Sequence, residues 1–259
     1  MRIITWKLHG KMAHFRKFYS NSTFLSYYIP PVTTVKGFLA GLLGLERDSY
    51  YLQFSNENCK VAVGIGSKIK KITQTMNLLK VESPKNLNGQ YNGRYTHVQN
   101  YTEWVVPQNI ITGDVCYRLA VWHKDKDIMD KLEKCLCQKD DIYLSRGISA
   151  ALGSAQCLCW VSGGCVCEAT PCLSGNEPVK MDIAVPKNAV KLIDFPKSGQ
   201  CSILKEESIT EFDKNRYITE NSKIEVLLSG NESPLLVNLQ ENTPYFKIEN
   251  KNQNMMLLG

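Results

Sequence analysis

The chain has 259 residues, of which 43% are hydrophobic, and a formal net charge of +6. A chain of this length and composition buries a substantial core, which excludes a disordered protein and a miniature held together by disulfides. The charge is unevenly divided, because residues 1–105 hold 14 Lys/Arg against 5 Asp/Glu, whereas residues 106–259 hold 17 against 20.

A basic N-terminal part is typical of a surface that binds a polyanion, although a solvated basic face without a partner has the same composition.

Residues 2–9 alternate apolar and polar side chains and predict a half-buried strand. Ile4, Trp6 and Leu8 share one face of this strand. The other face is polar enough to meet a ligand and carries Ile3, Thr5, Lys7 and His9.

No signal peptide is visible at this end of the sequence, and the longest apolar run, residues 37–45, is less than half the roughly 20 residues of a membrane span. We therefore expect a soluble cytoplasmic protein.

Residues 11–32 predict a loop rich in aromatic and basic side chains, which ends at Pro30 and Pro31. A helix capped by Thr33 or Thr34 should follow, up to about residue 45.

Residues 60–66 alternate again and predict a second strand. From residue 70 to 107 the chain is polar and basic, with Asn-Gly turn signals at 88–89 and 92–93, which favours a projecting hairpin. A central strand is expected over 115–122 and an amphipathic helix over 127–138.

Two short strands, 157–161 and 165–169, are predicted to form a hairpin around a Ser-Gly-Gly turn at 162–164. The resulting order, βαββαβ, indicates an α+β fold of the ferredoxin-like (RRM-like) class over residues 1–170. Residues 171–259 are more acidic and predict a small β-rich C-terminal appendage.

The ten cysteines are expected to be reduced, because the chain is long and shows no export signal. Two Cys-x-Cys pairs on the arms of the expected hairpin leave a structural zinc site as an alternative. The spacing is not the usual Cys-x2-Cys knuckle, and residues 135–137 repeat it on a helix, so we expect no metal and no cofactor. The four candidate ligands are Cys157, Cys159, Cys165 and Cys167, with Cys172 near.

Residues 13–16 read AHFR, and residues 26–44 read SYYIPPVTTVKGFLAGLLG. This combination of a Pro-Pro step with a glycine-containing helix resembles the N-terminal signature of the CRISPR-associated Cas-five family. Weaker matches are THVQ at 96–99, which precedes VCYR at 115–118, and ALGS at 151–154. The resemblance covers residues 1–169.

This resemblance implies a ferredoxin-like fold with an inserted hairpin thumb, residues 71–110. It also implies a subunit of a type I Cascade complex that holds the 5′ handle of the CRISPR RNA for antiviral defence. The implied partners are the Cas-seven backbone subunit, the large subunit that recognises the PAM and, indirectly, target DNA near the PAM.

Single-stranded RNA is usually held by rings that stack on bases and by cations that follow the phosphates. The basic aromatic loop, the first helix and the thumb supply such groups, and the late glycine turn would let the backbone approach a phosphate closely. The candidate RNA-binding residues are Phe15, Arg16, Lys17, Lys36, Arg94, Tyr95, His97, Gln99, Arg146, Gly153 and Ser154.

Some members of the resembled family cleave the guide precursor without metal, through a Tyr, Lys and His set that performs general acid–base catalysis. His123 and Lys124 could supply two members of such a set, and Tyr27 or Tyr50 the third. A non-catalytic RNA-binding subunit is the preferred reading. A metal-independent endoribonuclease and a scaffold protein without RNA contact are the alternatives.

Overall fold

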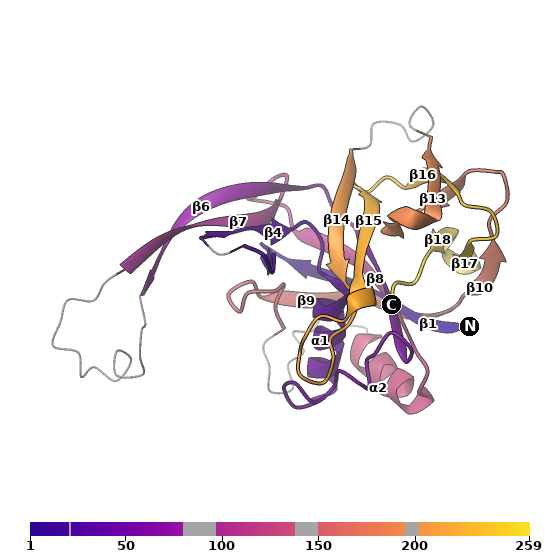
Figure 1. The fold of residues 1–259 in the computed structure, drawn as a ribbon, viewed down its shortest axis with the longest axis horizontal. Helices are drawn as coiled ribbons and strands as arrows, with labels where there is room; N and C mark the ends of the chain where they lie inside the picture. Colours follow the sequence, from indigo (N-terminus) through magenta and orange to yellow (C-terminus); the bar gives the residue numbers. More distant parts are fainter. Residues whose placement is uncertain (21, 80–96, 138–149, 195–201) are drawn as a thin grey trace.

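The computed structural model describes residues 1–20, 22–79, 97–137, 150–194 and 202–259 (Figure 1). Within these ranges the chain forms eighteen β-strands in six sheets and two α-helices. The α+β ferredoxin-like prediction, a βαββαβ domain with a small appendage, is therefore wrong. The molecule is mostly β, because residues 170–259 alone form nine strands where the sequence pattern indicated three.

The largest sheet has four antiparallel strands in the order β5-β8-β1-β9. Ile4, Trp6 and Leu8 are all buried on one face of the first strand, as predicted. The strand is not half-buried, however, because Ile3 and Thr5 on the other face are 0% and 7% exposed. The strands are β5 (Cys59–Ile65), β8 (Val115–His123), β1 (Arg2–Gly10) and β9 (Cys159–Glu168).

Both helices lie against this sheet, α1 (Val32–Leu42) at β5 and α2 (Lys126–Leu136) at β1, β8 and β9. The expected threonine cap is wrong: α1 begins directly after Pro31, whose carbonyl accepts from the amides of Thr34 and Val35. Helix α2 is capped by Asp125, whose side chain accepts from the amide of Asp127 at 2.8 Å.

The predicted turn at 162–164 is also wrong. Strand β9 runs through these residues without reversing and pairs with β1 on both sides of a bulge between Thr5 and Lys7. A β-bulge accommodates an extra residue while the strand keeps its direction, so the Ser-Gly-Gly sequence here marks an irregularity in one strand.

The long hairpin consists of β6 (Ile69–Leu79) and β7 (His97–Pro107), which pair antiparallel over their whole length. In Figure 1 its two arms extend away from the rest of the molecule. Its base is joined by three two-residue strands, of which β3 pairs with β7, and β2 with β4. They are β2 (Phe15–Arg16), β3 (Thr23–Phe24) and β4 (Ser26–Tyr27).

Three further sheets come from the C-terminal part, with the strand orders β10-β17-β18, β11-β16-β13 and β12-β15-β14. Their bounds are β10 (Thr170–Leu173), β11 (Val179–Met181), β12 (Val185–Pro186), β13 (Val190–Ile193), β14 (Ile203–Ile209), β15 (Lys223–Ser229), β16 (Leu235–Leu239), β17 (Pro244–Ile248) and β18 (Gln253–Met255).

The C-terminal strands share the main core. Val226, Leu228 and Leu258 are buried in one cluster with Trp6 of β1 and Leu132 of α2. A second cluster on the opposite face of the large sheet joins residues of β1, β5 and β8 to Ile183, Ile248 and Met255. The large sheet is thus covered by helices on one face and partly by C-terminal strands on the other.

None of the helices within the described ranges is both long and apolar enough to cross a membrane.

Candidate nucleic-acid interface

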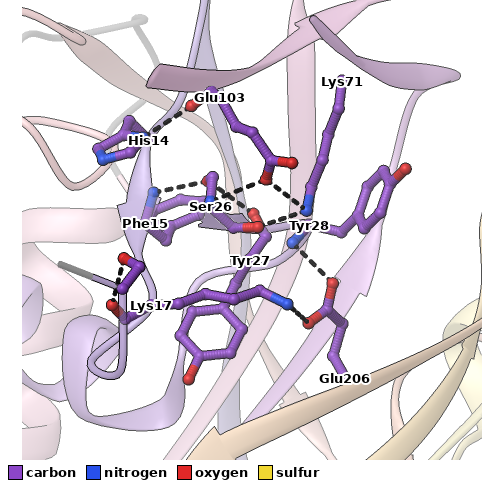
Figure 2. A network of polar contacts seen from close by, with 10 residues as sticks. His14, Phe15, Lys17, Ser26, Tyr27, Tyr28, Lys71, Glu103 and Glu206 are labelled. Carbon is purple, nitrogen blue, oxygen red and sulfur yellow. Dashed lines mark hydrogen bonds and ion pairs between the residues drawn. The ribbon is translucent and has the colours of Figure 1, made fainter. Parts of the chain in front are cut away.

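The base of the hairpin is organised around Ser26, which is fully buried. Its hydroxyl accepts from the amide of Phe15 at 3.0 Å, and its own amide donates to the Glu103 carboxylate at 3.0 Å. The Lys71 ammonium donates to the Ser26 carbonyl and lies 3.2 Å from the same carboxylate (Figure 2). These bonds fix β2, β4, β6 and β7 relative to one another.

Glu206 of β14 extends this network to the C-terminal part. Its carboxylate accepts from the amide of Tyr28 at 3.2 Å and lies 3.5 Å from the Lys17 ammonium (Figure 2). Burial lowers the pKa of Lys17, but the Glu206 charge and the neighbouring Tyr19 outweigh it and leave that pKa raised. Lys17 is therefore a fixed cation at neutral pH, and its charge is largely balanced by Glu206.

His14 connects the network to the loop at 150–154. Its Nδ1 is 2.7 Å from the carbonyl oxygen of Glu103, which can only accept, so Nδ1 carries the proton. Burial lowers the pKa of His14, and the ring is neutral at physiological pH.

Three cations of this region lie over aromatic rings. The Lys71 ammonium is 4.3 Å from the Tyr28 ring centre, and the Lys17 ammonium is 5.1 Å from the Tyr27 ring centre. The Arg16 guanidinium is 4.2 Å from the Phe24 ring centre. Such contacts hold the long basic side chains in place. Lys17 and Lys71 are also paired with carboxylates, so the exposed Arg16 is the cation of these three that a phosphate would meet.

Two exposed rings lie beside Lys17 in the same loop. Phe18 is 46% exposed and Tyr19 is 53% exposed, with ring centres 5.2 Å apart. Exposed adjacent rings offer stacking surfaces to unpaired bases. They were missing from the candidate residues, although the run Arg-Lys-Phe-Tyr at 16–19 carries the signal: two cations followed directly by two rings.

The hairpin itself is amphipathic. Because side chains alternate along a strand, the register places Lys71 next to Glu103 on a polar face that continues outward past Tyr101. Tyr101 is 61% exposed. The opposite face carries Ile72, Met76 and Trp104, which pack on the core. We call the first surface the hairpin polar face; it consists of Lys71, Thr73, Thr75, Asn77, Gln99, Tyr101 and Glu103.

Two candidate RNA-binding residues have structural roles instead. Phe15 is only 3% exposed and packs edge-on against Tyr117, with ring centres 5.7 Å apart. Lys36 is 2% exposed, and its ammonium donates to the side chain of Asn56 and the carbonyl of Thr210, both at 2.9 Å. Burial lowers the pKa of Lys36 to about 8. The prediction that Lys36 meets a phosphate is contradicted by this burial.

Gly153 and Ser154 lie beside the network. The amide of Ser154 donates to the carbonyl of His14 at 3.2 Å, and Gly153 has φ +88°, where a side chain would overlap that carbonyl. The glycine therefore permits a close approach of two backbone segments, which is the freedom predicted for it, but directed at His14.

The remaining candidates divide in two groups. Arg16 is exposed in β2, and Gln99 is exposed on the hairpin polar face. Arg94, Tyr95 and Arg146 lie outside the described residues, and of His97 only its backbone place at the start of β7 is described.

Of the two tyrosines suggested for a catalytic set, Tyr27 lies far from His123, whereas Tyr50 lies near it. The ring centre of Tyr50 is 6.1 Å from that of Phe54, which is 5.3 Å from that of His123. Tyr27 lies near Tyr117 in the first half of β8, because the Tyr117 hydroxyl donates to the carbonyl of the next residue, Tyr28, at 2.9 Å. His123 ends the same strand six residues further on, about 20 Å away. It is 5% exposed and bonded through both ring nitrogens, to the carbonyl of Gln53 and the amide of Asp125. Lys124 is exposed beside Glu57, 3.8 Å away.

The four cysteines of the zinc alternative are not gathered at one place, because Cys157 precedes β9 and the other three lie along it. Cys159 pairs with Gly10 and Cys165 with Thr5 of β1, so the two Cys-x-Cys pairs lie about 20 Å apart. Within the described ranges, no cluster of three His, Cys, Asp or Glu side chains is placed to hold a metal ion. The zinc alternative depended on the hairpin turn that the structure replaces with a continuous strand.

No family profile matches the chain, and no curated protein matches it by sequence. Among solved structures, a CRISPR protein from Archaeoglobus fulgidus aligns over 98% of both chains, with a TM-score of 0.57 and 12% identity. A chain described as part of a CRISPR RNA-guided surveillance complex aligns over 90% of this chain and 91% of its own, with a TM-score of 0.47 and 14% identity. The chain therefore has the overall fold of the Archaeoglobus fulgidus CRISPR protein.

Proposed function

We propose that this protein is a non-catalytic RNA-binding subunit of a CRISPR interference complex and holds the 5′ handle of the CRISPR RNA. The observation that carries the proposal is the hairpin base, where exposed Arg16, Phe18 and Tyr19 belong to the loop that Glu103 and Lys71 of the hairpin bind through Ser26. Cations beside exposed rings suit single-stranded RNA, whose bases stack while its phosphates are neutralised.

Two further features support it. The fold is that of a protein described as a CRISPR protein, with nearly complete coverage of both chains. Residues 13–16 and 26–44, which resemble the Cas-five signature, form β2, β4, α1 and the connection between β4 and α1. In this proposal the chain also contacts a Cas-seven backbone subunit and the large subunit of the complex, and thereby acts on target DNA near the PAM.

Binding of fluorescently labelled repeat RNA at several salt concentrations tests the proposal. Each phosphate contact adds about 0.7 to the slope of log affinity against log salt for a single strand. Arg16→Ala should lower the affinity about tenfold and reduce the slope by about one contact. Lys191→Ala, an exposed lysine on β13, is the matched control and should change neither quantity.

The same samples distinguish the alternatives. A scaffold protein without RNA contact would show no binding at low salt, and equal losses in the Arg16 and Lys191 variants would mean a diffuse charge effect. Product formation from the repeat RNA in EDTA would establish an endoribonuclease, and loss of product with His123→Ala would assign that histidine to it.

A further inference from the structure

A pocket of about 180 Å³ opens on the face of the large sheet that the helices do not cover. It lies where β1, β8 and β9 meet the C-terminal segment around β18. A pocket of this size holds more than one water molecule. Its polar lining comes from Thr5, Lys7, Arg118, Asp182, Lys251 and Gln253.

The charges of this lining are unbalanced. Lys7 and Arg118 are directly opposite each other in the antiparallel pair of β1 and β8. Like charges in that position repel each other and destabilise a sheet unless an anion lies between them. Lys251 brings a third cation to the pocket, against the single carboxylate of Asp182.

The existing contacts leave much of this positive charge uncompensated. Arg118 reaches Asp182 through one nitrogen only, at 3.4 Å, and its Nε is buried with no hydrogen-bond partner among the described residues. The Lys251 ammonium donates to the hydroxyl of Thr5 at 2.7 Å, is also hydrogen-bonded to the Cys165 side chain, and keeps one further donor. The donors that converge here exceed the acceptors, which is the composition of an anion site.

The pocket is open on the side of β9 and closed on the side of β5. Gly163 lies at the bulge of β9 with φ +59°, and a side chain there would meet nothing within 4 Å. On the other side, Arg118 is paired with Gly64 of β5, where a side chain would meet the carbonyl of Asp182 at 2.7 Å. An incoming anion therefore reaches Lys7 and Arg118 from the side of Gly163, while the Asp182 segment closes the pocket over Gly64.

We propose that this pocket binds the phosphate group of a nucleotide, with Lys7, Arg118 and Lys251 as its ligands. A phosphate presents several acceptor oxygens, which suit the fork of an arginine flanked by two ammonium groups. The site lies on the large sheet, and its residues are distinct from those of the hairpin interface. The phosphate comes either from a free or terminal phosphomonoester or from a phosphodiester inside an RNA strand.

Isothermal titration at low salt tests the site with three probes: inorganic phosphate, AMP, and the dinucleoside monophosphate ApA. Lys7→Gln and Lys251→Gln change exposed side chains and should each weaken binding about tenfold. Lys60→Gln is the matched control, because Lys60 lies in β5 on the same sheet but outside the pocket lining. Thermal unfolding of each variant verifies its fold.

Binding of AMP and phosphate without ApA would support a phosphomonoester ligand, and equal binding of ApA would support a phosphodiester. The proposal is overturned if no probe binds at millimolar concentration, or if Lys60→Gln weakens binding as much as Lys7→Gln. Loss of repeat-RNA binding in Arg16→Ala with AMP binding intact would show that the two sites are independent.

Discussion

Glycine 153 shows how a single residue can shape the candidate interface without touching a ligand. It has φ +88° and lies against the carbonyl of His14, which in turn contacts β7 through Glu103. Lys36 provides the complementary case, because a residue chosen for its charge is buried and bonds the C-terminal part. Residue type alone does not separate a ligand contact from an internal one.

We predict that Gly153→Ala lowers the free energy of unfolding by about 3 kcal/mol, through the left-handed backbone and the overlap with His14. Gly163→Ala is the matched control, because it has φ +59° but open space around it. That variant should lose only about 1 kcal/mol. Urea unfolding measures both, and equal losses would contradict the close approach of the two segments.

At the scale of elements, one face of the hairpin is exposed and available to a ligand, and the other face packs on the core. Tyr101 lies on the hairpin polar face at 61% exposed, and Trp104 lies on the opposite face at 3% exposed. They are three residues apart in β7, so the same strand presents one ring to solvent and buries the other.

Tyr101→Ala should therefore weaken repeat-RNA binding by about 1–2 kcal/mol, the contribution of one stacked base, and leave stability within about 0.5 kcal/mol. Trp104→Ala should lower the free energy of unfolding by about 3–5 kcal/mol through loss of core packing. Fluorescence anisotropy with RNA and urea unfolding test the two statements. A stability loss in the Tyr101 variant comparable to that of Trp104 would refute the assignment of faces.

The whole molecule is joined through β14 and β15, which belong to the C-terminal part yet hold the N-terminal loops. Glu206 binds Tyr28 and Lys17, and Val226 is buried in the same cluster as Trp6. All tryptophans of the chain lie in the N-terminal part, at positions 6, 104, 122 and 160. Their fluorescence therefore reports on the N-terminal part and, through Trp6 and Trp122, on its contacts with the C-terminal strands.

We predict that Val226→Ala lowers the midpoint of the tryptophan-detected urea transition, by a loss of about 2 kcal/mol in stability. Leu192→Ala, at a site 63% exposed on β13, is the matched control and should leave the midpoint unchanged. A tryptophan transition unaffected by Val226→Ala would mean that the two parts unfold independently.

The sequence by itself determined the elements whose burial repeats at a regular period. Strands β1, β5 and β8 and helix α2 are found within a few residues of their predicted bounds. Helix α2 shows the helical period of one buried face, whereas β5 and β8 are short apolar runs buried on both faces. It also located the basic and aromatic loop around Arg16, since charge and ring content are visible without any fold.

Only the tertiary structure decided the fold class, the course of β9 and the partners of the charges. Irregular short strands have no clear period, so the nine strands of residues 170–259 escaped a reading based on alternation. Whether a lysine meets solvent, as Lys7 does, or a carbonyl, as Lys36 does, depends on contacts between residues more than a hundred positions apart. Such contacts arise from packing, which no local pattern encodes.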